Sequence, residues 1–354
     1  MSKLDNILAK FFPPYKPIAP GIYTYQSPPE VNPPYRYHLR IEEDGSGVFV
    51  VNAKTVLILN QTAAEYAYHM VRGTNANDIS SEISHRFKID PAQALLDYRD
   101  FELKIQQMLE TPDLDPSIYM TDSRTEPNTT RLSAPLRIDC ALTFSVRPEE
   151  PAESAPISDE IQELTTSAWK KILSDAWAFG IPHVIFTGGE ATLRNDLAEI
   201  IKHAQGQGMV TGLLTDGLRF NDPEYMQSIL SAGLDHVMIT LQPDNPASWS
   251  ALDALIAEDI FVTPHLTITK ANSVQVQSAF DRIVQMNAPA LSLTITDESL
   301  ALIQKDLRNQ AADKQIELIW DIPVPYSALN PVAIELKHEP DEVSGAGRSW
   351  LYVE

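Results

Sequence analysis

The segment with the clearest chemical potential is Gly188-Gly189-Glu190, which follows an apolar run ending at Thr187. Glycines at such a position let a ligand approach the backbone closely, because no side chain stands in the way. A glutamate beside them can pair with an ammonium group. Since a tight turn from a strand into a helix also needs glycine, these three residues by themselves fit either a ligand site or a turn.

Other polar residues fall near later strand ends. Asp216 and Gln242 follow two such strands, and His265 lies within a third. These residues could form one site with Glu190 at the mouth of the fold, where the strands end, or each could have a separate structural role. The histidines form no HxxxH or HxH pair, and neither a catalytic-triad signature nor a Walker-type loop occurs. The single cysteine, Cys140, excludes an internal disulfide and a cluster held by three or four thiolates of this chain.

The elements that must position these residues alternate from Leu136 onward. Helical stretches separate the predicted strands, which are 137–144, 184–187, 210–214, 236–241, 262–269, 291–296 and 316–320. This order predicts an α/β fold with a parallel sheet. About six or seven units are too few for a closed eightfold barrel, so we predict a partial (β/α)6 TIM-like barrel over 136–354.

The first part of the chain has a different pattern. We predict a helix and a Pro-rich arm over 1–35, a small α+β winged-helix-like domain over 36–112, and a linker over 113–135. The domain combines a three-stranded meander at 36–42, 47–52 and 55–59 with three helices. The first helix is predicted to open with a capping box from Thr62 to Glu65 and to end at Gly73.

The phrase TVLILNQTAAEYAYHMVRGTNANDISSEI within this domain resembles the PqqD-like family, whose members hold the leader of ribosomally made peptides during modification. The matching residues are Leu59, Asn60, Thr62, Ala63, Ala64 and Gly73. The resemblance implies that strand 55–59 is an exposed edge that pairs with an extended peptide, while the third helix supplies an apolar wall. The predicted peptide-binding residues are Val56, Leu57, Ile58, Leu59, Tyr98 and Ile105. The alternative is a packing domain that binds nothing.

The second part resembles the radical S-adenosylmethionine (SAM) superfamily, especially the branch that modifies peptides. The resemblance lies in TGGEATLRNDL, LLTDGL, SAGLDHVMITLQ and HLTITKAN. It implies that Gly188, Gly189 and Glu190 contact the amino group of SAM. GAGRSWLYVE resembles the start of that branch's C-terminal extension, so we expect a chain truncated within that strand.

The same superfamily needs a CxxxCxxC loop after the first strand, and here the expected positions are Val146, Glu150 and Glu153. Valine offers no ligand and carboxylates are hard donors, whereas iron–sulfur clusters take thiolates. Cys140 lies inside the strand and is interpreted as a buried hydrophobe. We therefore expect no cofactor: no 4Fe–4S cluster, no other metal, and SAM bound only weakly at a vestigial site.

The net charge of the chain indicates which classes of binding partner are disfavoured. The chain has 27 basic and 48 acidic residues, a net charge of -21, which disfavours nucleic acid and anionic membranes. No long apolar segment or signal sequence is evident, so we expect a cytoplasmic protein.

The sequence thus predicts a cluster-free protein that binds and presents a precursor peptide, beside an active maturase. Two alternatives remain open. One is a radical SAM peptide maturase whose cluster ligands come from elsewhere, and the other is a cluster-independent SAM-binding enzyme.

Overall fold

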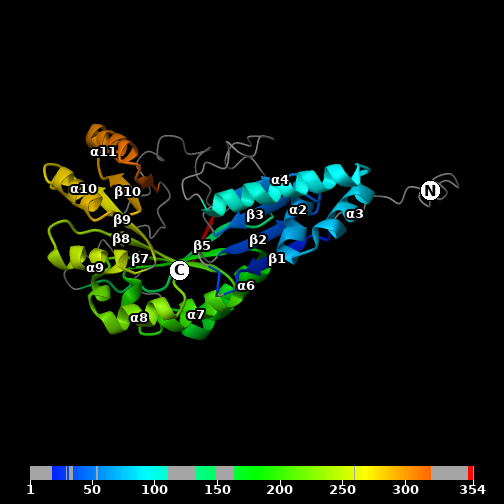
Figure 1. Cartoon of the computed structure of the whole chain (residues 1–354). Coiled ribbons are helices and arrows are strands. Elements are labelled where there is room, and N and C mark those ends of the chain that lie inside the picture. Colours follow the sequence, from blue (N-terminus) through cyan, green and yellow to red (C-terminus); the bar gives the residue numbers. More distant parts are fainter. Residues whose placement is uncertain are drawn as a thin grey trace. The chain divides into compact units, whose positions relative to one another are not determined.

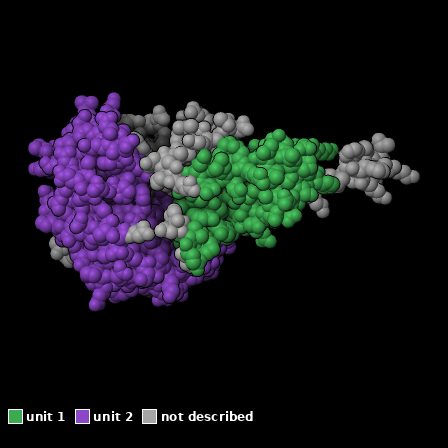
Figure 2. All heavy atoms as spheres, in the orientation of Figure 1, with its two compact units in different colours: residues 1–126 green, residues 127–354 purple. Residues whose placement is uncertain are grey.

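The computed structural model describes residues 18–28, 30–31, 35–52, 55–110, 133–147, 163–258, 260–319 and 350–353. The chain divides into two compact units, Met1–Glu126 and Pro127–Glu354 (Figure 2). The helix expected near the N-terminus, the linker, Glu150 and Glu153 lie wholly or mostly outside the described residues.

Unit 1 contains a four-stranded antiparallel sheet in the order β1-β2-β3-β4 (Figure 1). Its strands are β1 (Gly21–Gln26), β2 (Arg36–Ile41), β3 (Gly47–Val51) and β4 (Thr55–Leu59). The sequence predicted three of them and missed β1, which lies between the prolines of the supposed arm. Within the described ranges β4 pairs with β3 alone, so it forms one edge of the sheet, and β1 forms the other.

Three helices complete unit 1: α2 (Gln61–Arg72), α3 (Ala76–Phe87) and α4 (Pro91–Glu110). Helix α2 ends at Gly73 in a left-handed conformation, as predicted. Its start differs from the prediction: the cap is Asn60, whose side chain accepts a hydrogen bond from the Ala63 amide at 2.9 Å. The predicted capping box does not form, because Glu65 is buried and lies 3.2 Å from the Arg86 guanidinium.

Unit 2 is an α/β domain whose described strands form one parallel sheet, in the order β11-β10-β9-β8-β7-β6-β5-β12. The strands are β5 (Arg137–Ala141), β6 (His183–Thr187), β7 (Val210–Thr215), β8 (His236–Thr240), β9 (Phe261–Ile268), β10 (Ala290–Ile295), β11 (Glu317–Leu318) and β12 (Trp350–Val353). The predicted fold class is confirmed: a partial barrel of repeated strand–helix units (Figure 1).

Helices connect successive strands from β5 to β11, and short 3-10 turns follow several strand ends. The helices are α6 (Thr166–Phe179), α7 (Leu197–Gln207), α8 (Pro223–Ser231), α9 (Pro246–Ile256), α10 (Val276–Gln285) and α11 (Ala301–Asp313). The turns are η2 (Ala191–Leu193), η3 (Leu218–Asn221) and η4 (Glu298–Leu300). None of the helices within the described ranges is long and apolar enough to span a membrane.

The two faces of the unit 2 sheet have separate cores. On β6, Val184 and Phe186 join the large core that the helices cover, whereas Ile185 packs with Leu214 and Met238 in a small second cluster. Successive side chains of a strand point to opposite faces, so Ile185 marks the inner face of the partial barrel. The candidate site lies where this inner face meets the carboxyl ends of the strands.

Candidate functional site

The Gly188-Gly189 turn is shaped by its own chain. The Gly189 amide donates to Thr143 O and the Glu190 amide to Ser145 O, each at 2.8 Å, so the segments after β5 and β6 stay paired. A Cβ atom on Gly189 would lie 2.2 Å from Ser145 O, and one on Gly188 would lie 2.5 Å from Thr143 O. Neither position has room for a side chain. The close packing of the segment after β5 against this turn therefore requires glycine at both positions.

Glu190 is buried at 2% exposure and its carboxylate accepts four hydrogen bonds. Oε1 accepts from the amide of Thr192 at 2.9 Å, its hydroxyl at 2.5 Å and the Thr215 hydroxyl at 2.7 Å. Oε2 accepts from the Asp216 amide at 2.7 Å. Burial, and then the nearby Asp216 carboxylate, raise the pKa of Glu190 to about 7. Oε2, with one partner, keeps capacity for a further donor.

Asp216 lies beside Glu190, just past the end of β7, and is paired with Arg147. The Arg147 Nε atom contacts Asp216 Oδ2, and Nη2 lies 3.2 Å from Oδ1. Oδ1 also accepts from the Leu218 amide at 2.8 Å. The Asp216 side chain is 2% exposed and the Arg147 side chain 20%, so the guanidinium lies on the solvent side of the pair. Sequence reasoning missed Arg147, although it directly follows Val146, the first expected cluster position.

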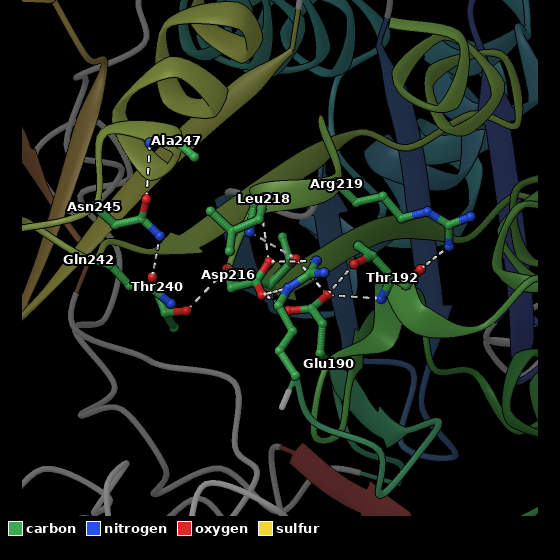
Figure 3. A network of polar contacts seen from close by, with 12 residues as sticks. Glu190, Thr192, Asp216, Leu218, Arg219, Thr240, Gln242, Asn245 and Ala247 are labelled. Carbon is green, nitrogen blue, oxygen red and sulfur yellow. Dashed lines mark hydrogen bonds and ion pairs between the residues drawn. The ribbon is translucent and has the colours of Figure 1, made fainter. Parts of the chain in front are cut away.

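Figure 3 shows this network at the strand ends. It extends from Glu190 to Thr192, whose carbonyl oxygen accepts from Arg219, and through Asp216 toward the end of β8. There Asn245 donates to Gln242 at 2.8 Å. The Thr240 hydroxyl donates to the Thr215 carbonyl oxygen at 3.2 Å, so polar groups gather at the carboxyl ends of β6, β7 and β8.

Thr187 adds an unsatisfied group to this band. It is two residues from Ile185 and therefore shares the inner face, and it is 1% exposed. Its hydroxyl is buried without a hydrogen-bond partner. Buried polar groups are ordinarily hydrogen-bonded, so this hydroxyl next to the glycines is available to a ligand or to water.

His265 does not contact Glu190. The alternative in which carboxylate, imidazole and amide groups form one site is therefore wrong. Its ring is 2% exposed and lies 3.1 Å from each of three hydroxyls, those of Thr267, Ser292 and Thr294. Burial lowers the pKa of His265 to about 4, so the ring is neutral at neutral pH. The histidine satisfies a polar part of the inner face.

The six predicted peptide-binding residues separate into two groups. Val56 and Ile58 are 38% and 41% exposed, on the edge strand β4. The other four are at most 5% exposed and belong to the core of unit 1: Leu57, Leu59, Tyr98 and Ile105. As folded, only Val56 and Ile58 offer substantial side-chain surface to a ligand.

Helix α4 nonetheless carries exposed apolar side chains. Leu96 and Leu103 are 59% and 53% exposed. Seven residues apart, they lie on one face of the helix, and this spacing was readable in the sequence. The apolar surface of α4 thus comes from these leucines instead of Tyr98 and Ile105.

The described residues give little support for a metal centre. Val146 has no donor atom, and Cys140 is fully buried in the helix-covered core, where burial raises the pKa of its thiol. Among the described residues, no three His, Cys, Asp or Glu side chains lie close enough to hold a metal ion. The remaining expected positions, Glu150 and Glu153, are outside the described ranges.

Comparison with known proteins defines the class of unit 2. Residues 148–296 match the family model of the radical SAM superfamily. A PqqA peptide cyclase of Bradyrhizobium diazoefficiens is 43% identical over 81 residues, which are 23% of this chain and 21% of the relative. One of Xanthomonas campestris pv. campestris is 35% identical over 86 residues, 24% of this chain and 23% of the relative. The matches span about a fifth of these relatives' length.

Two solved structures share the fold at low identity. Streptococcus suis SuiB bound to SAM has a TM-score of 0.54 at 12% identity, over 90% of this chain and 75% of SuiB. SuiB bound to its precursor peptide SuiA has a TM-score of 0.53 at 13% identity, over 79% and 70%. At this identity the likeness establishes the fold alone.

These comparisons contradict the expectation that the chain has no cofactor. That expectation held SAM to be weakly bound at most and a 4Fe–4S cluster to be absent. The matched superfamily uses both groups, and the SuiB structure of similar fold contains SAM. The expectation was wrong because it judged a whole domain from three missing thiols.

The residues present can be tested against each group. SAM fits: Gly188 and Gly189 keep side chains out of the turn beside Glu190, Glu190 Oε2 can accept another donor, and the Thr187 hydroxyl lacks a partner. For a 4Fe–4S cluster, the donors of the described residues do not fit, because the one cysteine is buried on the opposite face of the sheet. No step is derived through a cluster.

Proposed function

We propose that this chain binds a ribosomally made precursor peptide through unit 1 and SAM at the mouth of unit 2, and serves in the modification of that peptide. The observation that carries the proposal is the edge strand β4, whose outward side chains remain exposed. The superfamily match, the PqqA peptide cyclase relatives and the fold shared with SuiB support it.

Unit 1 supplies the recognition in this proposal, as a PqqD-like domain over 36–112. An edge strand can add an incoming extended peptide through main-chain hydrogen bonds. Val56 and Ile58 are two residues apart and so share one face of β4, where they can contact alternate side chains of the peptide. Leu57 and Leu59 lie on the opposite face of β4 and hold the strand against the core of unit 1.

Unit 2 supplies the SAM site. Gly188 and Gly189 add no side chains to the turn after β6, and Glu190 and Asp216 place two carboxylates beside it. In the superfamily SAM is the source of a radical, as its name states. The residues of this chain bind and orient the amino-acid end of the ligand and keep its surroundings polar but largely free of bulk water.

Two roles are compatible with this arrangement. Presentation of the peptide to a partner maturase is favoured by the unfavourable donor set around Cys140. Modification by this chain itself, with cluster ligands from elsewhere, is favoured by the match of 148–296 to the superfamily. Anaerobic reconstitution with iron and sulfide separates them, since about four irons bound per chain indicate the second.

The proposal is tested by searching the neighbourhood of the gene for this chain for a short open reading frame and titrating the full chain with that peptide as the candidate precursor peptide. We expect Val56→Glu to weaken binding about tenfold, because a charge opposes burial of a half-exposed apolar side chain. Val274→Glu is the matched control, since Val274 is an 86% exposed valine of unit 2. If the wild-type chain ignores the peptide, or the two variants bind it equally, the recognition role is wrong.

A further inference from the structure

We infer that Arg147, together with Glu190 and Asp216, binds the charged amino-acid end of SAM, with Arg147 taking the α-carboxylate and the two carboxylates taking the α-ammonium. The inference rests on the proposed function for the identity of the ligand. Arg147 would thereby be the residue that selects ligands with a free amino-acid group.

The first support is convergence. Three separate segments bring these side chains together: the one after β5 carries Arg147, the one after β6 carries Glu190, and the one after β7 carries Asp216. All three lie at the carboxyl ends of neighbouring parallel strands. Ligands of open α/β sheets bind at this edge.

The second support is the charge balance. Arg147 pairs with Asp216, and the buried Glu190 beside this pair adds a further negative charge when it is ionised. SAM carries an ammonium, a carboxylate and a sulfonium, a net charge of about +1, which complements that surplus. Burial, and then the neighbouring Asp216 carboxylate, raise the pKa of Glu190.

The third support is the unsatisfied hydroxyl of Thr187. It is 1% exposed, lies on the inner face and directly precedes the glycines. A structural ion pair between Arg147 and Asp216 would explain why those two side chains meet. It would not explain the buried, unpartnered hydroxyl of Thr187 at the end of β6, which a polar ligand would satisfy.

Binding would exchange one ion pair for two. In the structure Arg147 is paired with Asp216 from the solvent side. A ligand entering there can receive the guanidinium on its carboxylate, bidentately, while its ammonium contacts Asp216 and the open position on Glu190 Oε2. No proton transfer or bond cleavage is involved.

Two other charged or titratable groups lie near Glu190. Arg219, on η3, donates to the Thr192 carbonyl oxygen and lies 4.0 Å from the centroid of the Tyr225 ring. Tyr225, on α8, has a pKa raised above its ordinary value by burial, and its hydroxyl is buried without a hydrogen-bond partner among the described residues. Arg147 is the cation that pairs with Asp216.

The test measures binding to the full chain by calorimetry. The probes are SAM, S-adenosylhomocysteine and 5′-methylthioadenosine, the last of which lacks the amino-acid end. We expect Arg147→Gln to weaken the first two at least tenfold and to leave the third unchanged. Arg147→Lys should give an intermediate loss, because it keeps the charge without the bidentate fork. Lys270→Gln, which breaks another ion pair at a strand end, should change nothing.

Equal binding of SAM by Arg147→Gln and wild type would overturn the inference. So would an equal loss for all three probes, which indicates a purely structural role, or no binding of any probe to wild type. The peptide titration is independent of these results. A peptide that binds alongside an indifferent Arg147 refutes this inference alone, and an Arg147-dependent SAM site without peptide binding refutes the recognition role alone.

Discussion

The edge strand β4 of unit 1 and the mouth of unit 2 present opposite kinds of surface. Strand β4 offers main-chain groups and two exposed apolar side chains, Val56 and Ile58. The mouth offers buried carboxylates whose atoms are already held by their neighbours, as the four hydrogen bonds on Glu190 show. One surface is open and tolerant, and the other is closed and specific.

This difference separates two tasks. Main-chain pairing at a strand edge accepts many sequences, which suits a leader peptide with a few apolar anchors. Fixed charges in a buried site discriminate strongly, because an unmatched charge or donor there is costly. Under the proposed function, the chain would combine loose recognition of a polymer with strict recognition of a small charged ligand.

The largest effect on stability is expected at Gly189, where the turn after β6 has no room for a side chain. Gly189→Ala would place a Cβ atom 2.2 Å from a backbone oxygen, so the two paired segments must separate. We expect unit 2 to lose about 3 kcal/mol or more of unfolding free energy. Urea unfolding followed by tryptophan fluorescence measures this, because all five tryptophans of the chain lie beyond residue 126.

Gly206→Ala is the control for that substitution. Gly206 lies in helix α7, and a Cβ atom there meets nothing within 4 Å. Alanine favours a helix by roughly 0.5–1 kcal/mol over glycine, so unit 2 should become slightly more stable. Similar stabilities for the two variants would mean that the mouth is not closely packed.

A smaller effect concerns the charge of Glu190. Its pKa is about 7 in the folded chain against an ordinary value of 4.5, so between these values the folded state holds a proton that the unfolded state has released. Its contribution to stability is therefore full below about pH 4.5, falls as the pH rises to 7, and is lost above. Relative to Glu190→Gln, wild type should lose on the order of 2 kcal/mol across this window.

Unfolding free energies of both chains at several pH values measure that difference. Glu199→Gln serves as the reference, because Glu199 is 61% exposed and paired with Lys170 at the surface. A wild-type advantage that stays flat, or grows with pH, would contradict the raised pKa and the electrostatic picture of the mouth.

Most of the fold could be predicted from the sequence because strands and helices carry regular patterns. The strands of unit 2 and the end of α2 at Gly73 follow from apolar runs and glycine. Strand β1 was missed because its neighbours are prolines, and its pairing with β2 is a tertiary contact. The cap of α2 was misplaced by two residues, since Thr62 and Asn60 both fit the start of a helix.

The candidate site was harder to predict. Gly188, Gly189 and Glu190 stand out as a motif, but Arg147 becomes visible only when the fold brings it 69 positions along the chain to Asp216. The burial of Tyr98 and Ile105 likewise depends on how α4 packs. Sequence spacing places residues on a helix face, and tertiary packing decides whether that face is covered.

The central claim, that unit 1 pairs with a peptide at β4, is tested most directly by amide hydrogen exchange in the full chain. Strand β1 is an internal control, because it is the other edge of the same sheet. With the precursor peptide present, we predict slower exchange at amides within Thr55–Leu59 and no change within Gly21–Gln26. Unchanged exchange in both strands, or protection of β1 instead of β4, would contradict the account.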